Sequence, residues 1–335
     1  MRVLYDHQMF ALQKFGGITR VFVELARRLS QQPDCSVSWY RGYHTNSYDV
    51  SDFQGRLGRY WATERLPAWV DRRWSREQVN AFGLRWFSRT IPGGVDIYHP
   101  SYFDPSVLPL VRSRRLAVTV YDMILERLMA DLERFRPSLE GKRQIVERAD
   151  LIFVISESTR RDLIELLGVD HRKTVLVYPA SDIGNVPTGA LPPELQGKPY
   201  LLHVGPRSKY KNFTVLQEAF ARSERLRREL HVVCLGGPEF QEPELQFFAE
   251  HGLTDRFLRV TGDDAFLKAL YQHAVAFVYP SRYEGFGIPP LEAMTVGCPV
   301  VCCPTSSLPE VVGDATVGHG HGDAHEARLQ RTGAA

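Results

Sequence analysis

The stretch YPSRYEGFGIPPLEAMTVGCPVVCCPTSSLPEVVG, residues 279–313, decides the fold of this chain. An apolar run at 275–278 leads into the polar loop Glu284–Gly287, and two prolines at 289–290 then open a predicted helix. Glycines let backbone N–H groups approach a ligand closely, and a helix N-terminus favours an anion. The order of strand, glycine loop and helix therefore predicts a ligand-binding edge of a parallel sheet.

Two carboxylates, Glu284 and Glu292, flank this predicted anion site, and each can accept a pair of hydroxyl hydrogens. Hydroxyl pairs beside a phosphate indicate a sugar nucleotide. The E-x7-E spacing, with its embedded glycines and prolines, resembles the donor-binding motif of the retaining GT4 glycosyltransferases, which have the GT-B fold. The resemblance implies that Glu284 holds hydroxyls of the donor sugar and Glu292 those of the ribose. It also places the backbone of Gly285, Phe286 and Gly287 against the leaving diphosphate.

Composition bounds the class of protein. The chain has 335 residues, of which 44% are hydrophobic and 24% charged, so we expect an ordinary globular protein with two domains. A net charge of +2 gives no general attraction for nucleic acid. The five cysteines form no C-x-x-C pair and are interpreted as buried, reduced thiols of a cytosolic protein. No signal sequence or membrane-length apolar run is found, so we expect a cytoplasmic chain that can sit at the inner face of the plasma membrane.

Strands and helices alternate in two successive runs, which predicts an α/β protein with two doubly wound parallel-sheet, Rossmann-like domains facing a central cleft. We expect an acceptor-binding domain at 1–180, a linker rich in proline and glycine at 181–199, and a nucleotide-sugar-binding domain at 200–315. The resemblance stops near residue 315, and 316–335 is a short tail rich in glycine and histidine. GT4 chains normally continue further, so we expect this one to be truncated at its C-terminus.

The first predicted strand is followed by a loop that ends in Gly16 and Gly17, just before a helix with apolar residues at helical spacing. A glycine pair between a strand and a helix can hold an anion, although such pairs are also common in ordinary turns. The sequence GGITR resembles the GGI.R loop with which GT4 enzymes face the donor diphosphate and the acceptor. The resemblance therefore adds Gly16 and Gly17 to the donor site.

Two further strands of the first domain are predicted to end in polar residues at the same edge of the sheet, where ligands bind. His99 is interpreted as a structural histidine with a satisfied ring. Asp122 is the better candidate for catalysis, because Tyr121-Asp122-Met123 resembles the HDM or HDL of GT4 sequences. Tyr121 replaces the histidine of that motif, so the resemblance does not assign the catalytic or sugar-positioning role of that histidine to a residue here.

Arg207 and Lys211 lie in a loop between a predicted strand and a predicted helix, so both charges can converge on one diphosphate. Their G-x-R and K-N context resembles the GT4 pair that neutralises the leaving nucleoside diphosphate. Two fixed cations and the helix dipoles make a divalent ion unnecessary, so we expect a metal-independent enzyme. Asp263 is interpreted as a helix cap, and the histidines of the tail as part of a flexible segment rather than metal ligands.

Residues 51–90 combine eight arginines with four acidic residues and many aromatics. Two interpretations stay open. The segment can lie in an anionic membrane interface, or its aromatics can pack on the domain core while the arginines are solvated. A lipid-linked acceptor would favour the first interpretation without requiring it.

The resemblance implies transfer of a hexosyl group, with mannosyl favoured by similarity alone, from a nucleotide-diphosphate sugar to a hydroxyl of a lipid-linked or glycan acceptor. The leaving phosphate is expected to help deprotonate the acceptor, with no protein nucleophile and no cofactor besides the sugar-nucleotide co-substrate. The process would be the biosynthesis of surface polysaccharide such as lipopolysaccharide. The alternative is a truncated, inactive homologue that binds a nucleotide sugar. A nicotinamide-dependent oxidoreductase is disfavoured because G-x-G-x-x-G is missing.

Overall fold

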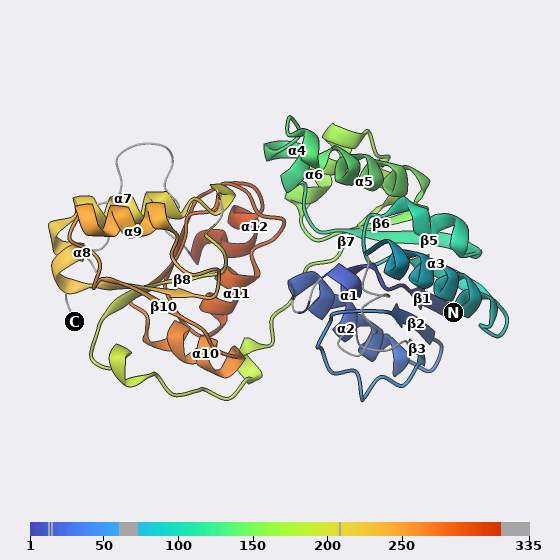
Figure 1. Cartoon of the computed structure of the whole chain (residues 1–335), viewed down its shortest axis with the longest axis horizontal. Coiled ribbons are helices and arrows are strands. Elements are labelled where there is room, and N and C mark those ends of the chain that lie inside the picture. The colour runs from blue at the N-terminus through green and yellow to red at the C-terminus, as the bar shows by residue number, and fades with distance from the viewer. Residues whose placement is uncertain (13, 15, 60–72, 208, 316–335) are drawn as a thin grey trace. The chain divides into compact units, whose positions relative to one another are not determined.

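The computed structural model describes residues 1–315 except 13, 15, 60–72 and 208 (Figure 1). The chain divides into two compact units. The first comprises Met1–Ile155 and Arg160–Val177, and the second comprises Ser156–Thr159 together with the chain from Tyr178 onward. Each unit contains a parallel β-sheet with helices packed on its faces, which confirms the predicted doubly wound α/β class. The predicted tail at 316–335 lies outside the described residues.

Among the described residues, the sheet of the first unit has seven strands in the order β3-β2-β1-β4-β5-β6-β7, and every neighbouring pair is parallel. The strands are β1 (Arg2–Tyr5), β2 (Ser36–Gly42), β3 (Arg56–Arg59), β4 (Val95–His99), β5 (Ser113–Val120), β6 (Leu151–Val154) and β7 (Thr174–Leu176). The strand order reverses between β1 and β4, so the loops that follow these two strands diverge at the carboxyl edge. In open α/β sheets this switch point is where ligands bind.

Helices cover both faces of the first sheet because the side chains of each strand alternate between them. Val3 and Tyr5 of β1 pack with Phe22 of α2, whereas Leu4 packs with Leu84 of α3. The helices of this part of the chain are α1 (Gln8–Leu12), α2 (Gly17–Ser30), α3 (Arg73–Arg89), α4 (Ile124–Leu128), α5 (Arg136–Arg148) and α6 (Glu157–Leu167), whose first residues belong to the second unit.

The second unit has a five-stranded parallel sheet in the order β10-β9-β8-β11-β12. Its strands are β8 (Tyr200–Val204), β9 (His231–Leu235), β10 (Phe257–Val260), β11 (Ala276–Tyr279) and β12 (Val300–Cys302). Its helices are α7 (Phe213–Arg222), α8 (Glu224–Glu229), α9 (Glu242–Glu250), α10 (Asp264–His273), α11 (Ile288–Thr295) and α12 (Leu308–Val312). The switch point lies between β8 and β11, so the loops after these two strands flank it.

Two separate cores hold this second sheet. Phe220 of α7 and Phe248 of α9 pack on one face, and Leu270 of α10 with Ala293 of α11 pack on the other. Figure 1 shows the same division, with α7 and α9 above the strands and α10 below them. The expected burial of the cysteines is confirmed for Cys234, Cys298 and Cys302, whereas Cys35 and Cys303 are only partly buried. Burial raises the pKa of Cys234 to about 12. Cys234 is therefore a core residue rather than a nucleophile.

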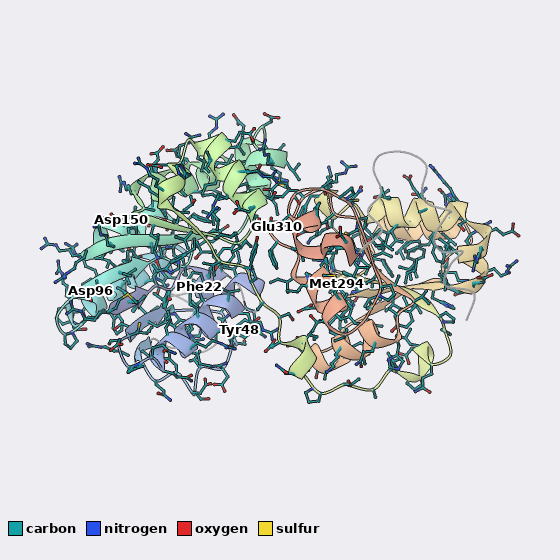
Figure 2. All side chains as sticks on the ribbon, turned by 180° about the vertical axis from the view of Figure 1, so that it is seen from behind. Phe22, Tyr48, Asp96, Asp150, Met294 and Glu310 are labelled. Carbon is teal, nitrogen blue, oxygen red and sulfur yellow. The ribbon has the colours of Figure 1, made fainter. Side chains whose placement is uncertain are left out.

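The amino-terminal edge of the first sheet is held by carboxylates. Asp96 of β4 accepts a hydrogen bond from the backbone N–H of Arg2 at 2.9 Å and pairs with its guanidinium at 2.8 Å. Asp150, just before β6, accepts from the backbone N–H of Leu116 at 2.8 Å. Figure 2 shows these two acids on the same side of the unit. They complete the hydrogen bonding of two backbone N–H groups, one at the start of β1 and one in β5 beside the start of β6.

At the opposite edge of the sheet, Asp6 is the buried centre of a polar network. It follows β1 directly and is fully buried. Its carboxylate accepts hydrogen bonds from the hydroxyl of Tyr98 at 2.7 Å, the backbone N–H of Ser101 at 2.9 Å and the amide nitrogen of Gln8 at 2.8 Å. These bonds tie the loop after β1 to the loop after β4 across the switch point.

We expect Asp6→Ala to lower the free energy of unfolding by roughly 3 kcal/mol, because each buried donor left without a partner costs about 1–3 kcal/mol. The measurement is a urea titration followed by circular dichroism. Glu133→Ala serves as the control. Glu133 is exposed and its ion pair with Arg136, at 3.7 Å, is long and exposed to solvent. Its loss should therefore change the free energy of unfolding by about 0.5 kcal/mol or less. Equal effects of the two substitutions would contradict the structural role of Asp6.

Candidate functional site

The candidate site lies at the carboxyl edge of the second sheet. There β8 leads into the short helix η8 (Lys209–Lys211), and β11 leads into the glycine loop that precedes α11. The two strands are hydrogen-bonded neighbours, so their following loops emerge side by side. The predicted strand, glycine loop and helix at 275–292 are confirmed, with Pro289 and Pro290 in the first turn of α11.

Lys211 and Glu284 form a buried ion pair between these two loops. The ammonium Nζ lies 2.7 Å from Glu284 Oε1 and 2.7 Å from the phenolic oxygen of Tyr279, to which it donates. Lys211 is 9% exposed and Glu284 is 8% exposed. Burial raises the pKa of the Tyr279 phenol well above its ordinary value, and the Glu284 carboxylate raises it further. The structure thus brings a predicted diphosphate cation into direct contact with the predicted sugar-binding carboxylate.

The glycine loop is held through its carbonyl groups. The hydroxyl of Ser307 lies 2.9 Å from the carbonyl oxygen of Glu284 and 2.6 Å from that of Phe286, and Ser156 donates to the carbonyl of Gly285 at 2.7 Å. Within the described part of the chain, the backbone N–H groups of residues 285–287 donate to no protein acceptor. The loop therefore presents unpaired donors at the N-terminus of α11, an arrangement that suits an anion.

Gly287 is required by the backbone itself. It precedes α11 with φ of 118°, in a region that residues with side chains rarely adopt. A Cβ atom at this position would also lie 2.9 Å from Cδ2 of Leu308. The loop geometry and the close approach of α12 both demand glycine here.

Glu292 lies in α11 and has a different partner from Glu284. Its Oε2 accepts a hydrogen bond from the hydroxyl of Tyr271 at 3.3 Å. Burial raises the pKa of that phenol, and the Glu292 carboxylate contributes. The two carboxylates of the E-x7-E spacing thus accept from different groups, Glu284 from the ammonium of Lys211 and Glu292 from the phenol of Tyr271.

Arg207 is bound to a carboxylate that sequence reasoning did not identify. Its side chain is 3% exposed, and its Nε donates to Glu244 Oε1 of α9 at 2.6 Å. Its Nη2 donates to the carbonyl oxygens of Pro238 at 2.8 Å and Glu239 at 3.1 Å. Glu244 is 37 residues away from Arg207. Its one local signal, a position in the first turn of α9, indicates only a helix cap.

In the first unit, Gly16 precedes α2 with φ of 176°, which is extended backbone that any residue adopts. A Cβ atom at Gly17 would meet nothing within 4 Å. The backbone conformation at Gly16 therefore allows residues other than glycine, and the space around Gly17 could hold a side chain. The hydroxyl of Tyr48 lies 3.4 Å from the nitrogen of Gly16 and 3.3 Å from its carbonyl oxygen, so it supports this loop.

Asp122 lies two residues beyond the end of β5, at the carboxyl end of that strand as predicted. Its Oδ1 accepts from the backbone N–H of Ile124 at 3.0 Å, and its carbonyl accepts from Lys142 Nζ at 3.0 Å. Lys142 is itself paired with Glu126 at 2.9 Å, and both side chains are buried. A buried ion pair therefore supports the loop that carries Asp122. Tyr121, which replaces the family's histidine, packs edge-on against Phe22 at 6.3 Å.

His99 has the structural environment expected for it. Its Nε2 lies 3.0 Å from the hydroxyl oxygen of Thr119, and its ring packs against those of Tyr5 and Phe22. Burial lowers its pKa to about 4. Asp263 caps α10 by accepting from the backbone N–H of Phe266 at 2.9 Å, as predicted. No group of three or more possible metal-ligating side chains was found among the described residues, and the histidine tail lies outside them.

The arginine- and aromatic-rich segment is described only in part, since 60–72 lie outside the described residues. Phe53 and Phe87 pack on the core, with ring centroids 5.7 Å from Trp39 and 5.8 Å from Tyr40. Phe82 and Trp86 of α3 instead remain 73% and 61% exposed. Packing on the core is therefore confirmed for Phe53 and Phe87, whereas the exposed Phe82 and Trp86 leave the membrane interpretation a prediction. Among the described helices, none has the length and apolar character needed to cross a bilayer.

Comparison with known proteins identifies the class. The model of glycosyltransferase family 4 matches residues 15–184, which is more than half of the chain, and that of glycosyl transferases group 1 matches 192–321. The chain belongs to this family of glycosyltransferases.

Two relatives are mannosyltransferases from Escherichia coli. The O-antigen chain mannosyltransferase B is 33% identical over 232 residues, which cover 65% of this chain and 60% of the relative. The serotype-specific mannosyltransferase WbdA is 32% identical over 206 residues, covering 56% of this chain and 24% of the relative. The chain thus spans less than two thirds of the length of either protein.

Solved structures share the fold. The lipopolysaccharide outer core galactosyltransferase WaaB matches with a TM-score of 0.61 at 17% identity, over 92% of this chain and 82% of that one. HepE from Anabaena, solved in complex with UDP-glucose, matches with a TM-score of 0.63 at 16% identity, again over 92% and 82%. The GT-B fold expected from the sequence is confirmed.

Stability is expected to depend on pH through His203, which is fully buried in β8 beside Phe213. Burial lowers its folded-state pKa to about 4, whereas an unfolded histidine titrates near 6.5. Between these values the unfolded chain binds more protons, so stability should fall as the pH drops from 7 to 4. Thermal unfolding of His203→Gln should show a shallower pH dependence than the unaltered chain over this range. The same pH dependence for both proteins would contradict the assignment of this effect to His203. His171→Gln, which changes an exposed histidine, is the control and should leave the pH dependence unchanged.

Proposed function

We propose that this chain is a retaining glycosyltransferase that moves a hexosyl group, with mannosyl favoured, from a nucleotide-diphosphate sugar to a hydroxyl of a lipid-linked or glycan acceptor. The observation that carries the proposal is the buried pair of Lys211 and Glu284 beside a glycine loop with unpaired N–H groups. Such a site offers hydroxyl recognition and anion recognition side by side. The mannosyl preference and a role in surface polysaccharide assembly rest on the names of the Escherichia coli relatives.

In the proposed reaction, the bond between the anomeric carbon and the diphosphate oxygen breaks while the acceptor oxygen bonds to the same face of that carbon. The acceptor's proton passes to an oxygen of the leaving phosphate, so no protein nucleophile is needed. Negative charge grows on the diphosphate, where Lys211, Arg207 and the N–H groups of Gly285–Gly287 stabilise it. Because these groups are already fixed by the fold, the proposed reaction is independent of a metal ion.

The remaining roles follow the same proposal. Glu284 holds the donor-sugar hydroxyls and Glu292 the ribose hydroxyls. In the first unit, Gly16 and Gly17 approach the diphosphate, and Asp122 contacts the reacting sugar or the acceptor. We accordingly propose an acceptor domain at 1–180, a linker at 181–199 and a donor domain at 200–315.

The protein is proposed to work in the cytoplasm at the inner face of the plasma membrane, and α3 is its proposed contact with lipid. Val79, Phe82 and Trp86 follow helical spacing and are all exposed, so they share one face. Exposed Arg85 and Arg89 lie on the same helix. Aromatics at headgroup level with arginines on phosphates suit an anionic lipid surface.

Incubation with sugar nucleotides tests the donor proposal. GDP-mannose, GDP, UDP-glucose and UDP are added to the full chain, and its thermal unfolding is measured. A ligand at 100 times its Kd should add about 2.7 kcal/mol to the stability, and we expect GDP-mannose to give the largest shift. Glu284→Gln should weaken binding and turnover about tenfold to a hundredfold, since a lost partner for a buried polar group costs about 1–3 kcal/mol.

Glu133→Gln, a change of an exposed residue, is the matched control for Glu284→Gln. Absence of a shift with every nucleotide would contradict the proposal. Stabilisation without donor hydrolysis or transfer to a lipid-linked acceptor would favour the alternative, an inactive sugar-nucleotide-binding protein.

Vesicle sedimentation tests the lipid contact. The double variant Phe82→Ser, Trp86→Ser should bind vesicles of phosphatidylglycerol at least tenfold more weakly, because burying each aromatic contributes about 1.5–3 kcal/mol. Binding should also weaken with salt and be lower on phosphatidylcholine. Leu245→Ser, which changes an exposed leucine of α9, is the control. Equal binding of the double variant and the unaltered chain would rule out α3 as the contact.

A further inference from the structure

The guanidinium of Arg207 is fixed by hydrogen bonds to a carboxylate and two carbonyl oxygens and by two aromatic rings. Its Nε and Nη2 are both occupied by the carboxylate of Glu244, at 2.6 Å and 3.3 Å, and Nη2 also donates to two carbonyl oxygens of the loop after β9. The guanidinium carbon lies 4.6 Å from the ring centroid of Phe240 and 5.7 Å from that of Phe213. The fold therefore fixes both the plane of this group and its rotation within that plane.

One nitrogen of Arg207 stands apart from this arrangement. Nη1 is buried and has no hydrogen-bond partner among the described residues. An unpaired buried donor costs about 1–3 kcal/mol, and native structures rarely keep one without a reason. The residue next to it is Gly237, where an added Cβ would lie 3.3 Å from Nη1 and 3.0 Å from the carbonyl oxygen of Gly205. The free corner of the guanidinium thus lies at the carboxyl ends of β8 and β9.

Glu244 links this geometry to helix α9. It is the third residue of that helix, and its Oε2 accepts from the backbone N–H of Gln241 at 2.8 Å, completing a capping box. The same carboxylate orients Arg207 through Oε1. The Glu244 side chain is 16% exposed and that of Arg207 is 3% exposed, so water is largely excluded from the ion pair. A charge-assisted bond in such a setting is stronger and more directional than one on the open surface.

We propose that Glu244 is a positioning residue for donor binding, which sets Arg207 so that Nη1 is the nitrogen offered to an oxygen of a nucleoside diphosphate. This inference rests on the proposed function, since it assumes that Arg207 meets the donor's diphosphate. Glu244 acts through Arg207 and does not touch the substrate. Loss of its negative charge frees the guanidinium to rotate, and the diphosphate then has to order it at the moment of binding.

A double-mutant cycle tests this role. GDP and UDP are titrated against the full chain by calorimetry, and the one that binds more tightly is used for all variants. Glu244→Gln keeps the size of the side chain and an oxygen that can accept from Gln241, but it removes the charge that holds Arg207. We expect its Kd for the nucleotide to rise about tenfold, as for Arg207→Gln. The double variant should be no weaker than Arg207→Gln alone, because Glu244 has no effect once Arg207 is gone.

Gln246→Ala is the matched control, because it alters an exposed side chain of α9 whose amide donates to Glu250 at 2.8 Å rather than to Glu244 or Arg207. It should leave the nucleotide Kd unchanged, and the unfolding temperature of each variant, measured alongside, separates a structural effect from a positioning effect. Additive losses in the double variant, or unchanged binding by Glu244→Gln, would overturn the inference while leaving the proposed function intact. If the unaltered chain bound neither GDP nor UDP, the proposed function itself would fail and the inference with it.

Discussion

The buried ion pair of Lys211 and Glu284 is the constraint on which the carboxyl edge of the second sheet depends. Removing a charged group from water costs several kcal/mol, and at 2.7 Å each partner compensates the other. Separating them would leave an uncompensated buried charge, at a cost of about 3–5 kcal/mol. The loop after β8 and the loop after β11 are therefore held as one unit. The hydroxyl of Tyr279 completes the arrangement from the end of β11 itself.

The ion pair fixes the position of the glycine loop, and short polar side chains fix the orientation of its peptide groups. Ser156 and Ser307 occupy the carbonyl groups of the loop, which turns the peptide planes so that the N–H groups of 285–287 are the ones left over. A longer side chain at 287 would collide with Leu308 and would not adopt the required φ. The unpaired N–H groups on which the proposed anion site rests are therefore set by tertiary contacts as much as by the glycines of the loop.

The sequence predicted those features that depend on local patterns. The strand, loop and helix around Glu284 follow from hydrophobic runs, proline and glycine within some 20 residues, and the structure confirms them. β3 was not predicted, because its sequence, RLGR, has little strand character. It forms as an edge strand paired to β2. Glu244, the partner of Arg207, was not predicted for a similar reason. Which carboxylate meets it depends on how α9 packs on the second sheet, and no local signal in the sequence specifies that.

Buried partners also change what the two cations can do. Lys211 faces Glu284 and Arg207 faces Glu244, so neither brings an uncompensated positive charge to a diphosphate. Net attraction for the anion must then come largely from the unpaired N–H groups of the glycine loop and the N-terminus of α11, worth about half an elementary charge. The ion pairs contribute directed donors and acceptors instead. A bare phosphate beside Lys211 would meet the Glu284 carboxylate as well and be repelled by it. A ligand that carries hydroxyl groups next to its phosphate can donate to that carboxylate, so under the proposed function we expect the paired site to prefer a sugar diphosphate to inorganic phosphate.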